Sequence, residues 1–456
     1  MDKAYIAQLQ KLLKADQVST SASVLAQHAR GESYDHSVMP DVVIFPESTE
    51  DVQKVMAFAF EHGIAVTPVA VNSSLEGHTV PLHGGISLDV TRMNQVISFR
   101  PEDLLIICQP AMTYPQINEH AKRSGLFFPI DPGAHASIGG MISTNASGTM
   151  AVRYGVTADY VMGLEIVTPT GEIIQIGTKA RKSSSGYNLT KLYCGAEGTL
   201  GVITEVTLKL VGLPEALMAA RVPFKSISEA SQFVISLIQA GVMVARCELV
   251  DANSIRAVNK HYQRSYPEEV TIFLEFQGNP LGIEREAETA RELAEAMGAV
   301  QFEASRDPKA RLELWEARHN LYYASVAAEA GKRNMTTDMA VPISKLAEVI
   351  ETSISLCENQ GFKAYAAGHV GDGNFHLLVF FEDGEEPKLD SLNHDLISLA
   401  LKAGGTSTGE HGVGLRKLKY MAAEHGPALE VMRQIKLALD PKNIMNPGKK
   451  IPAKVV

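Results

Sequence analysis

Two histidines flank a turn in the segment GHVGDGNFHLLVFF. Asp372 and Gly373 form an Asp-Gly pair, a strong signal for a two-residue hairpin turn between apolar strands. In such a hairpin His369 faces His376, and directly opposed residues have Cβ atoms about 4.5 to 5.5 Å apart on one face of the sheet. Two imidazoles so placed can converge on one cation, although an opposed pair can also be only hydrogen-bonded. The spacing therefore makes a divalent metal site one of two interpretations of this hairpin.

A second pair of chemically capable residues lies in the segment GTSTGEHGVG. Glu410 offers a carboxylate, and His411 offers an imidazole directly beside it. Neighbouring side chains of an extended segment point apart, so one can bind a cation while the other faces a substrate. A neutral imidazole can take a proton from a hydroxyl group near neutral pH. The alternative for His411 is a hydrogen bond that stabilises the loop, and the presence of Glu410 and the two histidines weakens this alternative.

A third group lies in the segment LWEARHNLYY. Trp315, Arg318 and Tyr322 have the spacing i, i+3 and i+7, which predicts that they share one face of a helix. Arg318 can form two parallel hydrogen bonds to a carboxylate, and Tyr322 can donate its hydroxyl. The other interpretation is an aromatic core stripe in which Arg318 makes a structural ion pair with an Asp or a Glu.

Two loops dense in Gly, Ser, Thr and Asn span residues 69–85 and 131–155. Small residues let main-chain N–H groups approach an anion closely, so these loops are candidates for binding a phosphate group. The chain has neither a GxGxxG fingerprint between a strand and a helix nor a GxxxxGK[ST] loop. A nucleotide would therefore be bound by these two loops and not by a Rossmann fold. A single loop of this kind is usually an ordinary surface loop, but two in one domain favour a binding role.

The elements around these loops predict an α+β domain. From Pro40 to about Leu210, short apolar runs alternate with turn residues, as in a series of strands. Helices are expected from the capping residue Ser48 to Gly63 and from Pro115 to Gly125. Residues 164–167 and 173–176 are expected to pair as a hairpin.

After Gly212 the pattern changes to longer helical periods, at residues 228–241, 282–297 and 311–331. The strands expected among them, at residues 270–276, 363–370 and 375–381, predict a sheet with helices packed on it. We therefore expect an N-terminal helical segment (1–36), a first domain (37–213) and a second domain (214–456) whose last stretch returns to the active centre.

Composition limits the classes of function. The chain has 456 residues, of which 45% are hydrophobic and 21% charged, as in a globular protein of two or three domains. With 42 basic and 52 acidic residues, its net charge is −10, which argues against nucleic-acid binding and against strong attraction to anionic lipid. A small anionic substrate would therefore need a locally basic pocket.

The four cysteines, Cys108, Cys194, Cys247 and Cys357, are scattered without a CxxC pair, which favours a reducing compartment. The first residues read as an amphipathic helix and not as a secretory signal, and no window approaches the ~18 consecutive apolar residues of a membrane span. We expect a protein that is cytoplasmic or peripheral at the inner face of a membrane.

Several motifs carry a resemblance to a known family. The segments VNSSLEGHTVPLHGGISLDVTRMN, DPGAHASIGGMISTNASGTMAVRYG, GLEIVTPTGEII and GYNLTKLYCGAEGTLGVITEV resemble, in order and spacing, the FAD-binding domain of the vanillyl-alcohol oxidase superfamily. The segments TTDMAVPISKL, GHVGDGNFH, GTSTGEHGVGLRK and DPKNIMNPGK resemble the FAD-linked D-lactate dehydrogenases, close to the glycolate oxidase flavoprotein subunit and the D-2-hydroxyglutarate dehydrogenases. The resemblance covers nearly the whole chain beyond the first helix.

This resemblance implies a fold and a cofactor. A two-subdomain FAD-binding domain of α+β class would be followed by a substrate (cap) domain, and FAD would be bound without a covalent link. Where relatives have a glycine-richer run before LEGH, this chain has VNSS. We therefore expect the phosphate-binding loop to persist, with a side chain in place of some of the close main-chain approach to the phosphate. The implied FAD-binding residues are Asn72, Ser73, Ser74, Leu75, Pro132, Gly133, Gly139, Gly140, Asn145, Ser147, Gly148, Gly155, Glu197, Gly201, Ile203 and Asn446.

The resemblance also divides the roles of the polar residues. It assigns His369, His376 and Glu410 to a divalent metal, with Zn or Mn favoured, and His411 to proton abstraction. Together with Arg318 and Tyr322, His411 would form the catalytic set. In this division the metal binds the hydroxyl and carboxylate oxygens of a 2-hydroxy acid and lowers the pKa of the hydroxyl.

The implied activity is the metal-assisted, FAD-dependent oxidation of a D-2-hydroxy acid, first of all D-lactate, to the 2-keto acid. D-2-hydroxyglutarate or glycolate is the alternative substrate, and a non-catalytic flavin subunit of a redox complex is the alternative of another class. Thr336 stands where the hydroxyglutarate enzymes carry a lysine, which favours a small monocarboxylate. The electron acceptor would be a cytochrome, a quinone or an electron-transfer flavoprotein and not NAD, and the sequence leaves a homodimer open.

Overall fold

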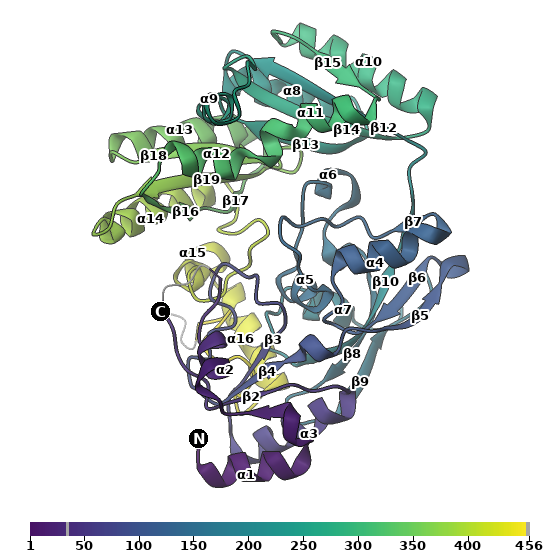
Figure 1. Cartoon of the computed structure of the whole chain (residues 1–456), viewed down its shortest axis with the longest axis vertical. Helices are drawn as coiled ribbons and strands as arrows, with labels where there is room; N and C mark the ends of the chain where they lie inside the picture. Colours follow the sequence, from purple (N-terminus) through teal and green to yellow (C-terminus); the bar gives the residue numbers. More distant parts are fainter. Residues whose placement is uncertain (33–35, 453–456) are drawn as a thin grey trace. The chain divides into compact units, whose positions relative to one another are not determined.

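Four β-sheets and the helices packed on them make up the described chain, which confirms the predicted α+β class (Figure 1). This computed structural model describes residues 1–32 and 36–452. The chain divides into two units, and each unit is built from separate stretches of sequence. The first unit comprises residues 1–147, 156–213 and the chain from 410 onward, and the second comprises residues 148–155 and 214–409. The last stretch of the chain thus groups with the first unit and not with residues 214–409.

The first unit contains a small sheet whose central strands are parallel. Its strand order is β1 (Val18–Ser19), β2 (Val42–Ile44), β4 (Ile86–Asp89) and β3 (Val66–Val69). Helix α3 (Thr49–His62) begins at the predicted cap, where the Oγ of Ser48 accepts a hydrogen bond from the N–H of Asp51 at 3.2 Å. The helix ends at Gly63, whose φ of 65° suits a residue without a Cβ. The apolar face of α3 packs in the core of this sheet, beside Leu9 of α1 (Lys3–Leu12).

The first unit also contains a two-stranded sheet of β7 (Leu126–Phe127) and β11 (Val211–Gly212), and a five-stranded antiparallel sheet. Its order is β5 (Val96–Arg100), β6 (Leu105–Cys108), β10 (Val202–Lys209), β8 (Val161–Val167) and β9 (Ile173–Gly177). The predicted hairpin is confirmed, since β8 pairs with β9 and Gly171 in the connection has a φ of 84°. Helix α4 (Tyr114–Ala121) continues through a short turn to Gly125, where the sequence predicted the end of a helix.

The C-terminal stretch adds to the core of the first unit. After α16 (Ala428–Leu439) the chain runs beside β3, and Val66 forms a parallel bridge with Met445. Ile444 and Met445 are fully or nearly fully buried in the same apolar cluster as the small sheet. The side chain of Lys436 donates hydrogen bonds to the carbonyls of Thr199 and Met445, at 2.7 and 2.9 Å.

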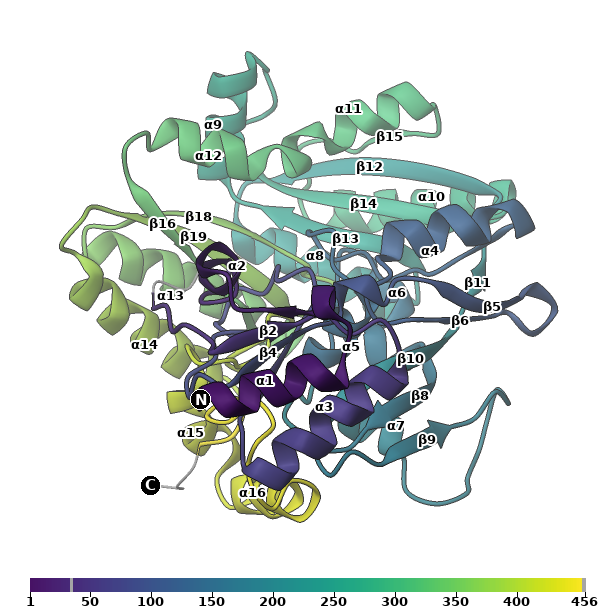
Figure 2. The ribbon, with the colours of Figure 1, turned by 60° about the horizontal axis from the view of Figure 1, so that its bottom comes forward.

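The second unit is built on an eight-stranded sheet. The strand order is β15 (Glu303–Ser305), β12 (Ala216–Phe224), β14 (Val270–Gly278), β13 (Val244–Val250), β18 (Lys363–Gly368), β19 (Asn374–Phe381) and β16 (Arg333–Thr336), with β17 (Met339–Ala340) also paired to β19. Figure 2 shows α9 (Ala252–Tyr262), α11 (Pro308–His319) and α12 (Leu321–Ala328) gathered on one side of it, where they share a core with the sheet. Helices α8 (Ile227–Gln239), α10 (Pro280–Ala296) and α13 (Leu346–Asn359) pack on the sheet and on one another. Among the described residues, no helix combines the length and the apolar character needed to cross a membrane.

Candidate active site

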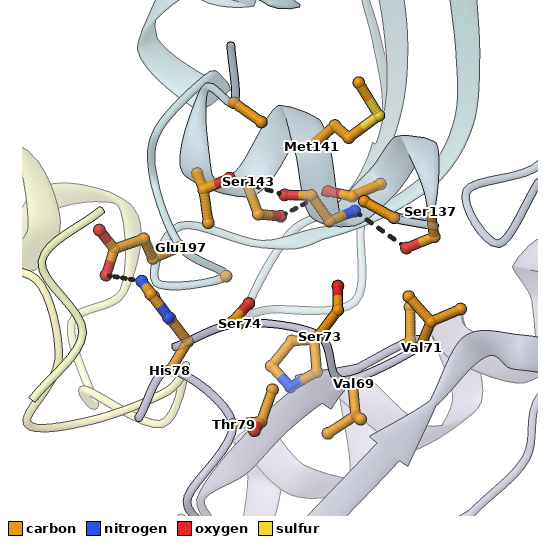
Figure 3. A pocket seen from close by; sticks show the side chains of 18 of the residues that line it. Val69, Val71, Ser73, Ser74, His78, Thr79, Ser137, Met141, Ser143 and Glu197 are labelled. Carbon is orange, nitrogen blue, oxygen red and sulfur yellow. Dashed lines mark hydrogen bonds and ion pairs between the residues drawn. The ribbon is translucent and has the colours of Figure 1, made fainter. Parts of the chain in front are cut away.

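A cavity of about 350 Å³ lies in the first unit. Its walls come from the loop that follows β3, from α5 (Ile138–Thr144) and the loop before it, from residues 193–203, and from the chain around 410 and 446. Figure 3 shows Ser73 and Ser74 on one wall and Ser137 and Ser143 on the facing wall. The two loops that the sequence singled out therefore line one cavity.

Most of the implied FAD-binding residues line this cavity, and a few do not. The lining includes Asn72, Ser73, Ser74, Leu75, Pro132, Gly133, Gly139, Gly140, Glu197, Gly201, Ile203 and Asn446. Four candidates lie outside the lining, namely Asn145, Ser147, Gly148 and Gly155. Gly148 and Gly155 belong to the second unit, and the side-chain oxygen of Asn145 accepts a hydrogen bond from the N–H of Ala158. The sequence did not single out His78, Thr79, Ser137, Met141, Ser143 or Tyr193, which also line the cavity.

The loop after β3 has the backbone shape that a phosphate cradle needs. Asn72 has a φ of 56°, a conformation that Asn adopts more readily than most residues with a Cβ. Its side chain donates to the carbonyl of Arg30 at 2.9 Å and accepts from the hydroxyl of Thr79 at 2.5 Å. On the other loop, a Cβ added at Gly133 would meet no atom within 4 Å, so its backbone faces open space. Asn72 thus holds a positive φ in the loop that lines the cavity.

A buried ion pair joins this loop to the C-terminal stretch. Glu197 lies 3.4 Å from Nε2 of His78, and it accepts hydrogen bonds from the N–H groups of Val413 and Gly414, both at 2.8 Å. Burial works to raise the pKa of Glu197, but the charges of His78 and Lys450 and the hydrogen bonds outweigh it and hold the pKa below its usual range. Glu197 is therefore an anion that anchors the 412–414 backbone beside the cavity.

Glu410 and His411 line the same cavity, and their side chains have different partners. Oε2 of Glu410 accepts a hydrogen bond from the hydroxyl of Ser147 at 3.0 Å. Nδ1 of His411 lies 3.2 Å from Oε1 of Glu76, whose side chain is only 1% exposed. Glu76 was not among the candidate residues, although it lies in the segment LEGH within the first of the two loops.

The hairpin of the second unit differs from the predicted one in its register. His376 pairs with Ala367 and not with His369, because residues 370–373 form a four-residue turn in place of the expected two-residue turn. Gly373 has a φ of 82°, and a Cβ there would lie 2.1 Å from the carbonyl oxygen of Val341. The shift is two residues, which preserves the face of the sheet, so the two histidines become diagonal neighbours. Their ring centroids are 5.5 Å apart.

Both imidazoles are oriented through Nδ1. Nδ1 of His369 lies 2.6 Å from Oε1 of Glu248, and Nδ1 of His376 lies 2.9 Å from the carbonyl oxygen of Thr337. An acceptor at Nδ1 keeps the proton there and puts the lone pair on Nε2, which is the usual orientation of a histidine that ligates a metal. The donor chemistry of this pair therefore fits a divalent metal.

Glu248 also contacts Arg318. Its side chain is fully buried, and its Oε2 accepts hydrogen bonds from Nε and Nη2 of Arg318, both at 2.9 Å. Burial works to raise the pKa of Glu248, but His369 and Arg318 outweigh it and keep the pKa low. Arg318 thus makes the ion pair that one interpretation of the sequence expected.

The predicted continuous helical face is wrong. Helix α11 ends at His319, and α12 begins at Leu321 after a break at Asn320. Trp315 is buried in the core of the second unit, whereas Tyr322 is half exposed and packs edge-on against Tyr323. The break places Arg318 and Tyr322 on different helices, so their spacing in the sequence does not put them on one face of a continuous helix.

Two models of known protein families together match most of the chain. Residues 40–177 match the model of an FAD binding domain, and residues 213–450 match the model "FAD linked oxidases, C-terminal domain". A probable mitochondrial D-lactate dehydrogenase of Danio rerio is 40% identical over 95% of this chain and 88% of its own length. A mitochondrial D-lactate dehydrogenase [cytochrome] of Arabidopsis thaliana is 38% identical over 99% of this chain and 81% of its own.

A solved structure shares the fold at lower identity. The 4-ethylphenol oxidase from Gulosibacter chungangensis superimposes with a TM-score of 0.79 at 18% identity, over 99% of this chain and 98% of that one. At this identity the likeness speaks for the fold alone, and it agrees with the expected two-domain FAD-binding architecture. The chain therefore belongs to the family of FAD-linked oxidases, in the branch that contains the D-lactate dehydrogenases.

Proposed function

We propose that this FAD-dependent enzyme oxidises D-lactate to the 2-keto acid with the help of a divalent metal. One observation carries the proposal most directly: Glu410 and His411, the residues able to bind a cation and to take a proton, line the same cavity as the residues expected to bind FAD. The relatives named D-lactate dehydrogenase, at 38 to 40% identity, support D-lactate as the substrate.

FAD would be held by the cavity of the first unit without a covalent link. The backbone of residues 72–75 and the glycines of the facing loop offer N–H groups to its phosphates. FAD supplies an acceptor for the hydride that leaves the hydroxyl-bearing carbon. The imidazole of His78 faces the buried Glu197, which gives it a structural partner and supports a non-covalent flavin. Denaturing the protein with acid should release all of the yellow colour into the supernatant.

The metal would be bound by His369, His376 and Glu410. The two histidines have their Nδ1 atoms on acceptors, so each can present Nε2 to a cation. Gly409 lies against Asn374, which precedes His376 by two residues. The contact is so close that a Cβ at Gly409 would overlap the side-chain nitrogen of Asn374. Glu410 follows at the next Cα, about 3.8 Å along the chain, which supports the inclusion of its carboxylate. Two imidazoles and a carboxylate suit Zn or Mn, and such a cation would lower the pKa of the substrate hydroxyl.

His411 would take the hydroxyl proton at Nε2. Its Nδ1 is directed at Glu76, so the lone pair lies on the other nitrogen. The substrate would lose one proton to His411 and one hydride to FAD, which balances the two-electron oxidation of an alcohol to a ketone. His411 lies next to Glu410 in the chain, and this supports a base and a metal ligand that act on the same hydroxyl.

The substrate carboxylate would bind to the metal and to Arg318, with Tyr322 as a further donor. Arg246, whose guanidinium lies over the ring of Trp315, is 3.1 Å from a carboxylate oxygen of Glu275. Because that ion pair balances the charge of Arg246, it supports a substrate with one carboxylate. A substrate with a distal carboxylate, such as D-2-hydroxyglutarate, would need a further cation, and residue 336 is a threonine.

The electron acceptor would be a cytochrome, as the names of two relatives state for those proteins, with a quinone or an electron-transfer flavoprotein as alternatives. The four cysteines are free in the structure, which supports a reducing compartment such as the cytoplasm, where the enzyme would also be able to work at the inner face of a membrane. The enzyme would bind no nucleic acid.

Anaerobic reduction of the flavin tests the substrate. The holoenzyme is mixed with D-lactate, L-lactate, glycolate or D-2-hydroxyglutarate, and the loss of flavin absorbance is followed with time. We expect D-lactate to bleach the flavin fastest and L-lactate to leave it oxidised, because a fixed base and a fixed metal address one face of the substrate. Equal rates with both lactate enantiomers would contradict the proposal, and faster bleaching with D-2-hydroxyglutarate would move the assignment to that substrate.

A further inference from the structure

The buried carboxylate of Glu76 has no role in the chemistry described so far, although it faces His411. Its side chain is 1% exposed, and Oε1 lies 3.2 Å from Nδ1 of His411. A buried carboxylate without a cationic partner would be costly, and this one has Lys417 at 3.5 Å and Arg416 at 3.8 Å. Both residues of the pair belong to the first unit.

We propose that Glu76 is the positioning residue of the catalytic base: it holds Nδ1–H of His411 so that Nε2 faces the substrate, and its negative charge stabilises the imidazolium that forms when His411 takes the hydroxyl proton. This inference rests on the proposed role of His411 as the base. Glu76 itself keeps its charge throughout and contacts neither substrate nor cofactor.

Main-chain contacts hold the loop of Glu76 beside the loop that follows His411. The carbonyl of Glu76 accepts hydrogen bonds from the N–H groups of Leu415 and Arg416, at 2.8 and 3.3 Å. Gly414 has a φ of 51°, and a Cβ at this position would lie 2.2 Å from the carbonyl oxygen of Glu76. Only a glycine therefore allows the two loops to approach this closely, and the approach brings the carboxylate to the imidazole.

The charges around Glu76 favour its anionic form. Burial works to raise the pKa of Glu76, but Lys417 first, and then the hydrogen bond and charge of His411 and the charge of Arg416, lower it further than burial raises it. Independently of the protonation of His411, the carboxylate has the cations of Lys417 at 3.5 Å and Arg416 at 3.8 Å beside it. A preorganised anion on the far nitrogen of a histidine base fixes its tautomer and stabilises its cation, as in catalytic triads.

The cations around Glu76 also explain why the carboxylate can act without becoming protonated. Lys417 is 4% exposed, so its ammonium is directed into the protein and not into solvent. When His411 is neutral, Lys417 and Arg416 balance the charge of Glu76. When His411 becomes a cation, the carboxylate is already next to the new charge, and no group has to move.

A double-mutant cycle on the holoenzyme tests the inference. The four proteins are the wild type, Glu76→Gln, His411→Ala and the double variant, and the measured quantity is the anaerobic rate of flavin reduction at saturating D-lactate. We expect Glu76→Gln to lower this rate by roughly 10²-fold, because a glutamine lacks the charge and can also donate to Nδ1 and thus favour the wrong tautomer. Its KM, FAD content and metal content should stay near those of the wild type.

The cycle separates a positioning role from a structural one. If Glu76 acts through His411, Glu76→Gln should have almost no further effect in the His411→Ala background. An undiminished effect in that background, or a wild-type rate for Glu76→Gln beside a slow His411→Ala, would overturn this inference and leave the base assignment standing. A wild-type rate for His411→Ala would overturn the base assignment and this inference with it.

Two further variants guard against a folding artefact. Glu76→Asp keeps the charge but withdraws it by one methylene group, so its rate should lie between those of the wild type and Glu76→Gln. If Glu76→Gln does not fold, the cycle is run with Glu76→Asp, and the same outcomes decide. The matched control is His28→Gln, which removes another buried histidine–carboxylate pair of the first unit, at 2.9 Å from Asp89, and should lower the melting temperature without slowing flavin reduction.

Discussion

The carboxylate of Glu248 lies 2.6 Å from Nδ1 of His369 and is fully buried. An anion in this position fixes the ring and raises the basicity of the opposite nitrogen, and the loss of such a partner typically costs a metal site about 10- to 100-fold in affinity. We therefore expect Glu248→Gln to lower the metal content after dialysis against a weak chelator, as measured by elemental analysis, while the FAD content is unchanged.

The matched control for Glu248→Gln is Glu275→Gln. Glu275 is a similarly buried carboxylate on the neighbouring strand, and it pairs with Arg246 in place of a histidine. Its variant should retain the metal. Equal metal loss in both variants would show that the effect comes from general loosening of the sheet.

Glu410→Ala and His411→Ala should behave differently although the residues are adjacent. Glu410→Ala is expected to lose metal and activity together, whereas His411→Ala should keep its metal and its FAD and reduce the flavin ~10² to 10⁴ times more slowly. Elemental analysis and single-turnover absorbance report the two quantities separately. Removal of the metal from the wild type with a chelator should abolish activity as Glu410→Ala does. Addition of Zn or Mn to the chelated wild type should restore the activity. Loss of metal from His411→Ala would refute the division of roles.

Arg318→Met should destabilise the protein far more than the removal of an exposed arginine. It leaves the carboxylate of Glu248 buried with one partner fewer, which typically costs about 3 to 5 kcal/mol. Arg264→Met removes an exposed ion pair to Glu316, a residue on the same helix as Arg318, and should leave the melting temperature almost unchanged. Melting temperatures of the two variants give the comparison, and similar values would contradict the importance of burial. If Arg318 also holds the substrate carboxylate, the KM for D-lactate should rise in its variant alone.

The buried ammonium group of Lys449 should make the stability of the protein depend on pH. Burial lowers its pKa from 10.5 to about 7 in the folded protein. Between pH 7 and about 10 the unfolded chain therefore binds more protons than the folded protein at this residue, and stability gains from it as pH rises. The melting temperature of the wild type relative to Lys449→Met should increase from pH 7 to pH 10. A constant difference over this range would show that the ammonium is not shifted.

The sequence predicted elements well where the signal was local. The cap at Ser48 and the end of α3 at Gly63 depend on neighbouring residues, and both agree with the structure. The turn after His369 was misjudged: the Asp-Gly pair predicts two turn residues, whereas residues 370–373 form the turn and Gly373 lies against the carbonyl of Val341. The break at Asn320 is likewise invisible in the spacing of apolar residues.

Glu76 and Glu248 were missed for a related reason. Each is a single carboxylate without a motif of its own, and each meets its histidine across a sequence separation of more than 100 residues. Motifs identify the groups that perform chemistry, because their types and spacing are constrained together. The carboxylates that orient those groups are identified only by the fold.

The position of Ile444 and Met445 in the core of the first unit has a consequence for biosynthesis. The small sheet begins near the N-terminus, but its bridge to Val66 and the cavity wall formed by Glu410, His411 and Asn446 come from the end of the chain. On the ribosome, the early strands must therefore wait for residues 444 and 445 to emerge before their apolar face is covered. Cofactor loading should follow the synthesis of residue 446, and a nascent chain stalled before residue 440 should take up no flavin.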